Sequence, residues 1–270
     1  MRELIDAIRA KKGLRYLDDG FIRERVERIL GADARIMRKW EARKSFAQFA
    51  RSKEYESLLK AVRKELRVVY GVFQDGETRQ VSPENLHTVL ETHVSTRERL
   101  PFYDLIYKEL AARIPAPKSV LDLGCGLNPL TQGMMARHGW RPEMIGVDIS
   151  SADMAFLEGA MRTLGIPGRT ITADLTKEEG MRALDGVQAD VTLVLKLLDT
   201  LEETRRFVSY DLFDHIRSPW IVVSFPTTSL GGKRRISTKG RSWFERLLHR
   251  KALAWETFSV ENELFYVIQR

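Results

Sequence analysis

Apolar residues recur at helical spacing through the first ninety residues of the chain. Ile22, Val26 and Ile29 would share one face of a helix, and the stretch from Leu58 to Val69 repeats the pattern. Turn-forming residues at 13, at 31–33 and at 74–76 interrupt this periodicity. We therefore predict a folded domain over residues 1–90, built as a bundle of three or four short helices.

The pattern changes after about residue 100, where short apolar runs alternate with helical stretches. Such alternation is typical of βαβ units around a parallel sheet. The predicted strands are 118–122, 144–148, 169–173, 190–195 and 219–225. Residues 253–260 and 264–269 then alternate apolar and polar positions on either side of Glu261-Asn262, which predicts a terminal hairpin. Residues 91–270 are thus predicted to form an α/β domain.

The first predicted strand runs into a glycine-rich turn, Gly124-Cys125-Gly126, and we expect a helix to follow. Glycines permit unusual backbone angles there and let a ligand approach the main chain. Asn128 is a favourable N-cap residue, and Pro129 suits the first helical position. A strand, a glycine turn and a helix in this order predict a nucleotide-like ligand at the carboxyl edge of the sheet.

Acidic residues close the first three predicted strands, at Asp122, Asp148 and Asp174. A carboxylate at the end of the second strand can accept hydrogen bonds from ribose hydroxyls. A dinucleotide fingerprint needs a third glycine after the turn, but Asn128-Pro129 stands there, which disfavours a dehydrogenase. Each carboxylate alone could be a solvated strand end or a helix cap. Together they resemble the pattern of class I S-adenosylmethionine (AdoMet) methyltransferases.

The composition is that of a globular protein, with 43% hydrophobic and 30% charged residues. No apolar stretch approaches the ~20 residues that span a bilayer, and the N-terminus lacks the apolar core of a signal peptide. Cys125 is the single cysteine, which excludes an internal disulfide and fits a reducing cytoplasm. We expect a cytoplasmic protein with no membrane partner.

The net charge of +7 is concentrated in the N-terminal third. Residues 1–90 hold 20 Lys and Arg against 14 Asp and Glu, whereas residues 91–270 hold 24 against 23. This excess favours a nucleic-acid partner over a solvated, salt-bridged helical face. The candidate RNA-binding cations are Arg9, Lys11, Lys12, Arg15, Lys60, Arg63, Lys64 and Arg67, with Lys233, Arg234 and Arg235 from a loop after the fifth strand.

A second candidate segment, His-Val-Ser-Thr-Arg-Glu-Arg-Leu-Pro, occupies residues 93–101. Ser95 and Glu98 have the spacing of a capping box, and Pro101 can begin a helix. That interpretation leaves His93 and the two arginines unexplained. An arginine fork suits a carboxylate such as the methionine tail of AdoMet.

Three motifs together resemble the aminoglycoside-resistance 16S rRNA (guanine-N7) methyltransferases. They are the 93–99 segment, Asp122 to Leu130, and Val223 to Gly232, and the resemblance extends to Arg15-Tyr16 and to Ala61–Tyr70. After Gly232 the family usually continues through a Gly-Met pair, which this chain lacks. The resemblance implies a class I methyltransferase fold, with five parallel strands, a closing hairpin whose last strand is antiparallel, and an N-terminal helical domain that docks on 16S rRNA.

The resemblance also implies a site. AdoMet would be the cofactor, S-adenosyl-L-homocysteine the product, and a decoding-centre guanine in helix 44 of 16S rRNA, within the 30S subunit, the target. It implies that Arg99 binds the methionine carboxylate and Asp148 the ribose. The cofactor residues it implies are His93, Ser95, Thr96, Arg97, Arg99, Gly124, Cys125, Gly126, Asp148, Ile149, Asp174, Leu175 and Leu195; Ser224, Phe225, Pro226 and Ser229 would position the target. We expect a monomer.

The expected chemistry needs neither a general base nor a metal. Guanine N7 has an in-plane lone pair and no proton to lose, so transfer requires alignment and exclusion of water. The chain has Lys196-Leu197-Leu198-Asp199 where amine methyltransferases carry an Asn/Asp-Pro-Pro-aromatic run, and its only cysteine lies in the glycine turn. Three alternatives remain open: an N1-adenine 16S rRNA methyltransferase, a catalytically silent rRNA-binding or assembly protein, and a small-molecule methyltransferase.

Overall fold

The computed structural model describes residues 1–67, 80–227 and 241–270. The described chain forms two compact units, and the division between them falls in the segment 68–79. One unit contains the N-terminal helices together with Ser150–Ala152, and the other contains the rest of the chain. The helices at residues 86–99, part of which the sequence assigned to the first domain, belong to the second unit. The turn expected at 74–76 lies outside the described residues.

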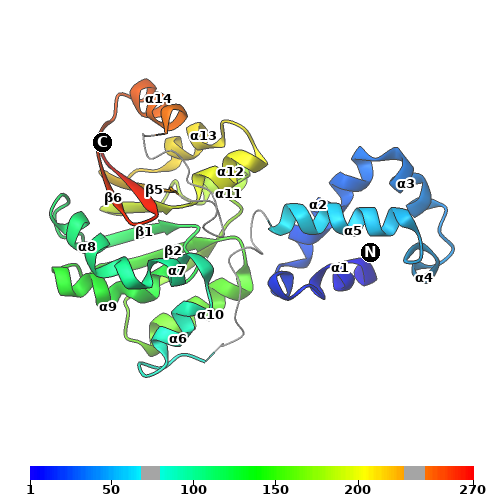
Figure 1. The fold of residues 1–270 in the computed structure, drawn as a ribbon, viewed down its shortest axis with the longest axis horizontal. Coiled ribbons are helices and arrows are strands. Elements are labelled where there is room, and N and C mark those ends of the chain that lie inside the picture. Colours follow the sequence, from blue (N-terminus) through cyan, green and yellow to red (C-terminus); the bar gives the residue numbers. More distant parts are fainter. Residues whose placement is uncertain (68–79, 228–240) are drawn as a thin grey trace. The chain divides into compact units, whose positions relative to one another are not determined.

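The N-terminal unit is entirely helical among its described residues (Figure 1). Its helices are α1 (Arg2–Arg9), the 3-10 turn η1 (Lys12–Leu14), α2 (Asp19–Ala32), α3 (Ala34–Glu41), α4 (Phe46–Phe49) and α5 (Lys53–Leu66). The break expected at 31–33 occurs at Asp33, whose side chain caps α3 by accepting hydrogen bonds from the backbone of Arg35 and Ile36. The apolar faces meet in a core that includes Ile8 and Val62, so this segment is a folded domain rather than a basic tail.

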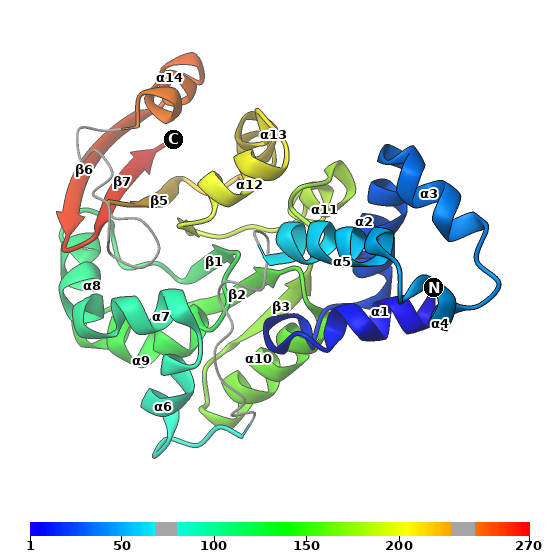
Figure 2. The same ribbon diagram turned by 45° about the vertical axis from the view of Figure 1, so that its right-hand side comes forward.

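The second unit is built on one seven-stranded sheet in the order β3-β2-β1-β4-β5-β7-β6 (Figure 2). The strands are β1 (Ser119–Leu123), β2 (Glu143–Asp148), β3 (Gly168–Thr172), β4 (Val191–Leu195), β5 (Trp220–Pro226), β6 (Ala254–Val260) and β7 (Glu263–Gln269). The first five are parallel, and the hairpin β6–β7 closes the sheet with β7 antiparallel to β5. The predicted class I methyltransferase sheet is confirmed.

Helices cover both faces of this sheet. One face packs on α11 (Glu178–Arg182), α12 (Leu198–Thr204), α13 (Val208–His215) and α14 (Ser242–Arg250). The other packs on α6 (Leu86–Glu91), α8 (Tyr103–Ala111), α9 (Gln132–Met135) and α10 (Ser151–Thr163). Short elements η3 (Leu100–Phe102), η4 (Asn128–Thr131) and η5 (Ala136–His138) connect them, and α7 (Val94–Arg99) precedes η3. Because β4 and β5 are buried on both faces, their sequences are almost wholly apolar.

Candidate active site

The glycine turn after β1 is fastened to the end of β2. Gly124 and Gly126 have φ values of 63° and 49°, in the left-handed region that favours glycine. The Gly126 N–H donates to Asp148 Oδ2 over 3.0 Å, and the Ile149 N–H donates to Asp148 Oδ1 over 2.7 Å. Burial raises the pKa of Asp148, and these two donors oppose that rise. Each carboxylate oxygen retains a second lone pair for a ligand hydroxyl.

His93 covers this turn from the side of α7. A Cβ added to Gly126 would lie 2.5 Å from Cε1 and Nε2 of the His93 ring, so only glycine fits beneath the imidazole. The ring Nδ1 lies 3.0 Å from Oγ1 of Thr96, in the first turn of α7. Burial, together with the charge of Arg99, lowers the pKa of His93 to about 3, and the imidazole is therefore neutral at pH 7.

The capping-box interpretation of Ser95 and Glu98 is wrong. Helix α7 begins at Val94 with His93 as its N-cap residue, so Ser95 lies inside the helix and cannot cap it. Pro101 falls in the 3-10 turn η3 rather than at the start of α8. The two arginines of the segment diverge: Arg97 is exposed, whereas Arg99 is buried.

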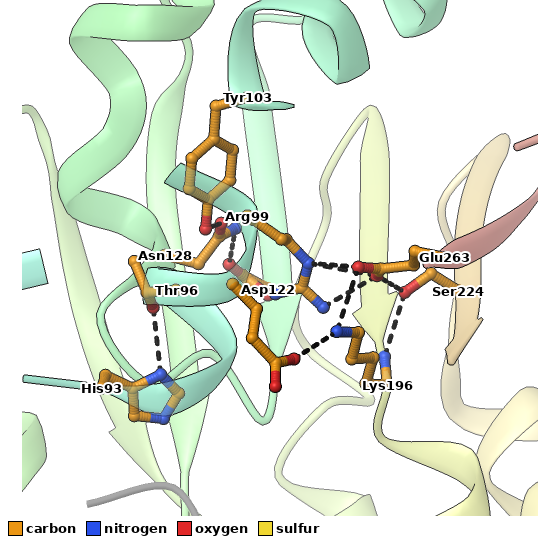
Figure 3. Close-up of polar contacts among 10 residues, drawn as sticks. His93, Thr96, Arg99, Tyr103, Asp122, Asn128, Lys196, Ser224 and Glu263 are labelled. Carbon is orange, nitrogen blue, oxygen red and sulfur yellow. Dashed lines mark hydrogen bonds and ion pairs between the residues drawn. The ribbon is translucent and has the colours of Figure 1, made fainter. Parts of the chain in front are cut away.

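Asp122 lies on the face of β1 that α8 covers and forms part of a buried hydrogen-bond chain (Figure 3). Asn128 donates to Asp122 Oδ2 over 2.7 Å, and the Tyr103 hydroxyl donates to Asn128 Oδ1 over 2.8 Å. Burial raises the pKa of Asp122 to about 7 and that of Tyr103 to about 12. The expectation that Asn128 caps a helix is wrong, because its amide is used in this chain and Asn128 is itself the first residue of the 3-10 turn η4, which has Leu127 at its N-cap position.

Arg99 is paired with Glu263, the first residue of β7 (Figure 3). Arg99 Nε lies 3.0 and 3.1 Å from the two carboxylate oxygens, and Nη2 lies 2.9 Å from Oε1. Both residues are only 4% exposed. Burial raises the pKa of Glu263, but the charges of Arg99 and Lys196 outweigh it and leave this pKa below its ordinary value. The pair therefore stays ionised.

Lys196 and Ser224 complete the surroundings of Glu263. Lys196 follows β4 with a positive φ of 54°, and its Nζ lies 3.4 Å from Glu263 and 2.8 Å from Glu98. Its backbone N–H donates to the Ser224 carbonyl and hydroxyl oxygens, each over 3.1 Å, while the Ser224 hydroxyl donates to Glu263. These contacts join α7 to the carboxyl edge of the sheet and to the closing hairpin.

Several of the other predicted residues lie at the same edge. Asp174 follows β3 and accepts hydrogen bonds from the Thr176 backbone and hydroxyl, 3.1 and 2.5 Å away, and Leu175 is buried in the core. Leu195 ends β4 and is half-buried. Cys125 is buried, and burial raises the pKa of its thiol, which makes it unsuited to act as a nucleophile.

The end of β5 supports the site mainly through buried side chains. Ser224 is fully buried on Glu263, and the Phe225 ring packs against Trp243, Phe244 and Tyr266. Only the backbone of Phe225 is thus left for the expected positioning of a target. The Pro226 carbonyl accepts a hydrogen bond from Arg241, whose guanidinium also pairs with Asp199 in α12. Ser229, Lys233, Arg234 and Arg235 lie outside the described residues.

The helical unit gathers most of its predicted RNA-binding cations around one groove of about 640 Å³. The groove is lined by Lys11, Glu56, Leu59, Lys60, Arg63, Lys64 and Arg67. Arg9 instead pairs with Asp19 over 2.6 Å, Arg15 is exposed beside η1, and Lys12 begins η1. This unit therefore presents a concentrated positive surface.

Glu263, Lys196 and Tyr103 belong to the site although no sequence motif marks them. Glu263 follows a turn and resembles a solvated hairpin residue, and Lys196 resembles a residue of a surface loop; only the pairing of distant strands buries them. Within the described ranges, no helix is long and apolar enough to cross a membrane, and no group of three or more His, Cys, Asp or Glu side chains is placed to hold a metal ion.

Comparison with known proteins adds an independent finding. Residues 51–267 match the family described as "Ribosomal RNA methyltransferase (FmrO)". The chain is 38% identical over 183 residues to a 16S rRNA (guanine(1405)-N(7))-methyltransferase of Frankia casuarinae, and 37% identical over 186 residues to one of Micromonospora echinospora. These matches cover 67% and 68% of this chain but only 62% and 66% of the relatives.

The fold comparison covers the whole chain. The crystal structure of the 16S rRNA methyltransferase RmtF in complex with S-adenosyl-L-homocysteine is similar with a TM-score of 0.73 and 26% sequence identity. The similarity covers 100% of this chain and 97% of that one.

Proposed function

Because the chain belongs to the ribosomal RNA methyltransferase (FmrO) family, we propose that it methylates N7 of a guanine in 16S rRNA, with AdoMet as the methyl donor. The observation that carries this proposal is the family match over residues 51–267, which includes all of α5 and nearly all of the α/β unit. The names of the relatives suggest that the target guanine is the one at position 1405. The 30S subunit would be the substrate.

The residues at the carboxyl edge of the sheet fit AdoMet. A Cβ on Gly124 or Gly126 would strike Leu197 or His93, so these two side chains pack directly on the turn and would border the bound AdoMet. Asp148 is held there by two backbone donors and can accept the ribose hydroxyls. The Arg99 guanidinium binds Glu263 through Nε and Nη2, and its Nη1 donors would take the methionine carboxylate.

When bound, AdoMet supplies a methyl group activated by a cationic sulfonium. The N7 lone pair of guanine forms the new C–N bond as the methyl–sulfur bond breaks, and no proton leaves the acceptor. The chain therefore has to hold the acceptor in line and exclude water. The neutral His93 and the buried Asp122–Asn128–Tyr103 chain suit this task, because they shape the edge of the sheet without needing to exchange a proton.

The helical unit would supply the affinity for RNA. Its groove brings five cations together, and such cations bind phosphates with strong salt dependence. N7 faces the deep, narrow major groove of an RNA helix, which an active site cannot enter. We therefore infer that the guanine is turned out of its stack, at a cost of a few kcal/mol that phosphate contacts offset.

The test is to methylate purified 30S subunits and deproteinised 16S rRNA, then map the product. Borohydride and aniline cleave the RNA at N7-methylguanine, and primer extension locates the break. A stop without cleavage at an adenine would indicate the N1-adenine alternative. Binding of 30S subunits without methyl transfer would indicate the silent rRNA-binding protein.

Two variants separate the cofactor site from the fold. Asp148→Ala should lose AdoMet binding in calorimetry while it keeps RNA binding. Asp104→Asn, at an exposed carboxylate on α8, is the matched control and should bind AdoMet as the wild type does. Undiminished AdoMet affinity in Asp148→Ala would contradict the proposed site.

A further inference from the structure

Phe207 has a backbone conformation and a solvent exposure that are both unfavourable for a phenylalanine. It joins α12 to α13, its φ is +66°, and its side chain is 62% exposed. Leu105 is the other large apolar side chain that stands exposed in the described ranges. A bulky aromatic residue is rarely found in the left-handed region, because its side chain then crowds the backbone. Exposure also forgoes the favourable burial of the ring.

The surrounding side chains hold this unfavourable conformation in place. The Glu202 carboxylate accepts the backbone N–H of Phe207 over 2.7 Å and that of Ser209 over 2.9 Å. One acidic side chain therefore ties both ends of the turn to α12. Such over-determination is what allows a strained residue to persist, and it is characteristic of ligand-binding positions.

Arginines and a second aromatic ring border Phe207. The Arg206 guanidinium carbon lies 5.5 Å from the Phe207 ring centroid, and the Tyr210 ring lies 6.2 Å away, edge-on. The Arg250 guanidinium carbon, on α14, lies 5.6 Å from the Tyr210 ring, and Phe244 of α14 also contacts Phe213 of α13. Arg206, Phe207, Tyr210 and Arg250 are hereafter called the Phe207 patch.

The charges of the Phe207 patch favour an anionic partner. Arg206 and Arg250 are exposed, and no described carboxylate forms an ion pair with either. Of the neighbouring acids, Glu202 is occupied by the backbone and Asp211 pairs with Arg205 over 2.9 Å, which leaves Glu203 as an exposed carboxylate of the same segment. The apolar surface is one ring wide, whereas protein partners usually need a contiguous apolar patch.

Helix α12 connects the Phe207 patch to the candidate active site. Helix α12 starts two residues after Lys196, and its Asp199 is paired with Arg241 beside Pro226. The seven residues of α12 span about 10 Å, so Phe207 lies roughly one short helix away from the carboxyl edge of the sheet. That distance is within reach of nucleotides that flank a target in the site.

We propose that the Phe207 patch is a stacking platform for one unpaired base of the substrate RNA, with Phe207 against the base and Arg206 and Arg250 on the adjoining phosphates. Aromatic rings and guanidinium planes stack on bases of any identity and thereby stabilise a splayed strand. This inference rests on the proposed function and adds to it an RNA contact on the catalytic unit, separate from the basic groove of the helical unit.

The test compares Phe207→Gly with Phe207→Trp in the full chain. Glycine adopts a φ of +66° without strain, so Phe207→Gly should keep the thermal stability and the AdoMet affinity of the wild type. Its Kd for purified 30S subunits should rise about 5- to 100-fold, the effect of losing one base–aromatic stack. Phe207→Trp should bind nearly as the wild type, and Leu105→Ser is the matched control at the other exposed apolar side chain.

A photo-crosslinking residue at position 207 identifies the partner directly. A crosslink to a 16S rRNA nucleotide supports the platform, whereas a crosslink confined to a ribosomal protein, or no crosslink, overturns it. Equal 30S affinity of Phe207→Gly and the wild type also overturns it, while methylation by the wild type leaves the proposed function standing. A wild-type chain that neither binds nor methylates RNA refutes both.

Discussion

Removing the charge of Glu263 should destabilise the α/β unit severely. Glu263→Gln keeps the shape of the side chain but leaves the Arg99 guanidinium buried without its anion. Arg99 is 4% exposed and makes three contacts of 2.9–3.1 Å to this carboxylate, and Lys196 lies 3.4 Å from it. Breaking one side of a buried ion pair costs about 3–5 kcal/mol.

This loss of folding free energy corresponds to a lower melting temperature, Tm. For a unit of roughly 200 residues, 1 kcal/mol shifts Tm by about 2–4 °C, so Glu263→Gln should melt about 6–20 °C below the wild type. Differential scanning calorimetry and urea unfolding measure it. Arg162→Gln is the matched control, because its exposed i,i+4 pair with Glu158 should contribute less than ~1 kcal/mol.

A second variant tests the cause. The double substitution Arg99→Met with Glu263→Leu removes both buried charges and should recover most of the stability lost in Glu263→Gln, because an apolar pair carries no desolvation penalty. The double variant should nevertheless bind AdoMet more weakly than the wild type if Arg99 binds the methionine carboxylate. A Glu263→Gln protein that unfolds within ~1 kcal/mol of the wild type would refute the reasoning.

Three further predictions concern the turn, the histidine and the groove. Gly126→Ala should lower the free energy of unfolding by about 1–3 kcal/mol and weaken AdoMet binding, because the φ of residue 126 is +49° and the new Cβ would strike the His93 ring. Adding His93→Ala should restore only the part of this stability that the steric clash removes, as calorimetry would show. The folded-state pKa of His93, about 3, lies below its unfolded value of ~6.5, so only the unfolded chain takes up a proton between these values. The free energy of unfolding should therefore fall as pH drops from about 6.5 towards 3. Urea unfolding across this range should show a weaker pH dependence for His93→Gln, and an equal pH dependence would contradict a buried neutral imidazole. Replacing Lys60 and Lys64 by Gln should lower the log–log salt slope of 30S binding by about 1–2, with Arg162→Gln as the control, and an unchanged slope would mean that the groove does not bind phosphates.

Much of the architecture follows from local patterns. Short apolar runs predicted all five parallel strands to within a residue or so, and β4 and β5 are almost wholly apolar because both of their faces are covered. The glycine turn and Asp148 were also identifiable, since a tight turn after a strand and a carboxylate at the next strand end occupy neighbouring positions at one sheet edge.

Local motifs were less reliable where several partners compete for one side chain. Asn128 has the character of an N-cap and Ser95 the spacing of a capping box, yet Asn128 bonds to Asp122 and Tyr103, and α7 starts before Ser95. A buried carboxylate that must be satisfied can outweigh a cap that water could replace. Capping rules cannot show this, because they consider only near neighbours.

By itself, the chain's sequence determined the strands, the glycine turn and the excess charge of the helical segment, all of which depend on residues close together along the chain. Tertiary structure alone decided that Arg99 meets Glu263, 164 residues further on, and that Phe207 is held exposed at a positive φ. The physical reason is that burial and ion pairing depend on which strands become neighbours. That choice is made when β7 inserts antiparallel beside β5 and brings a turn residue into the core.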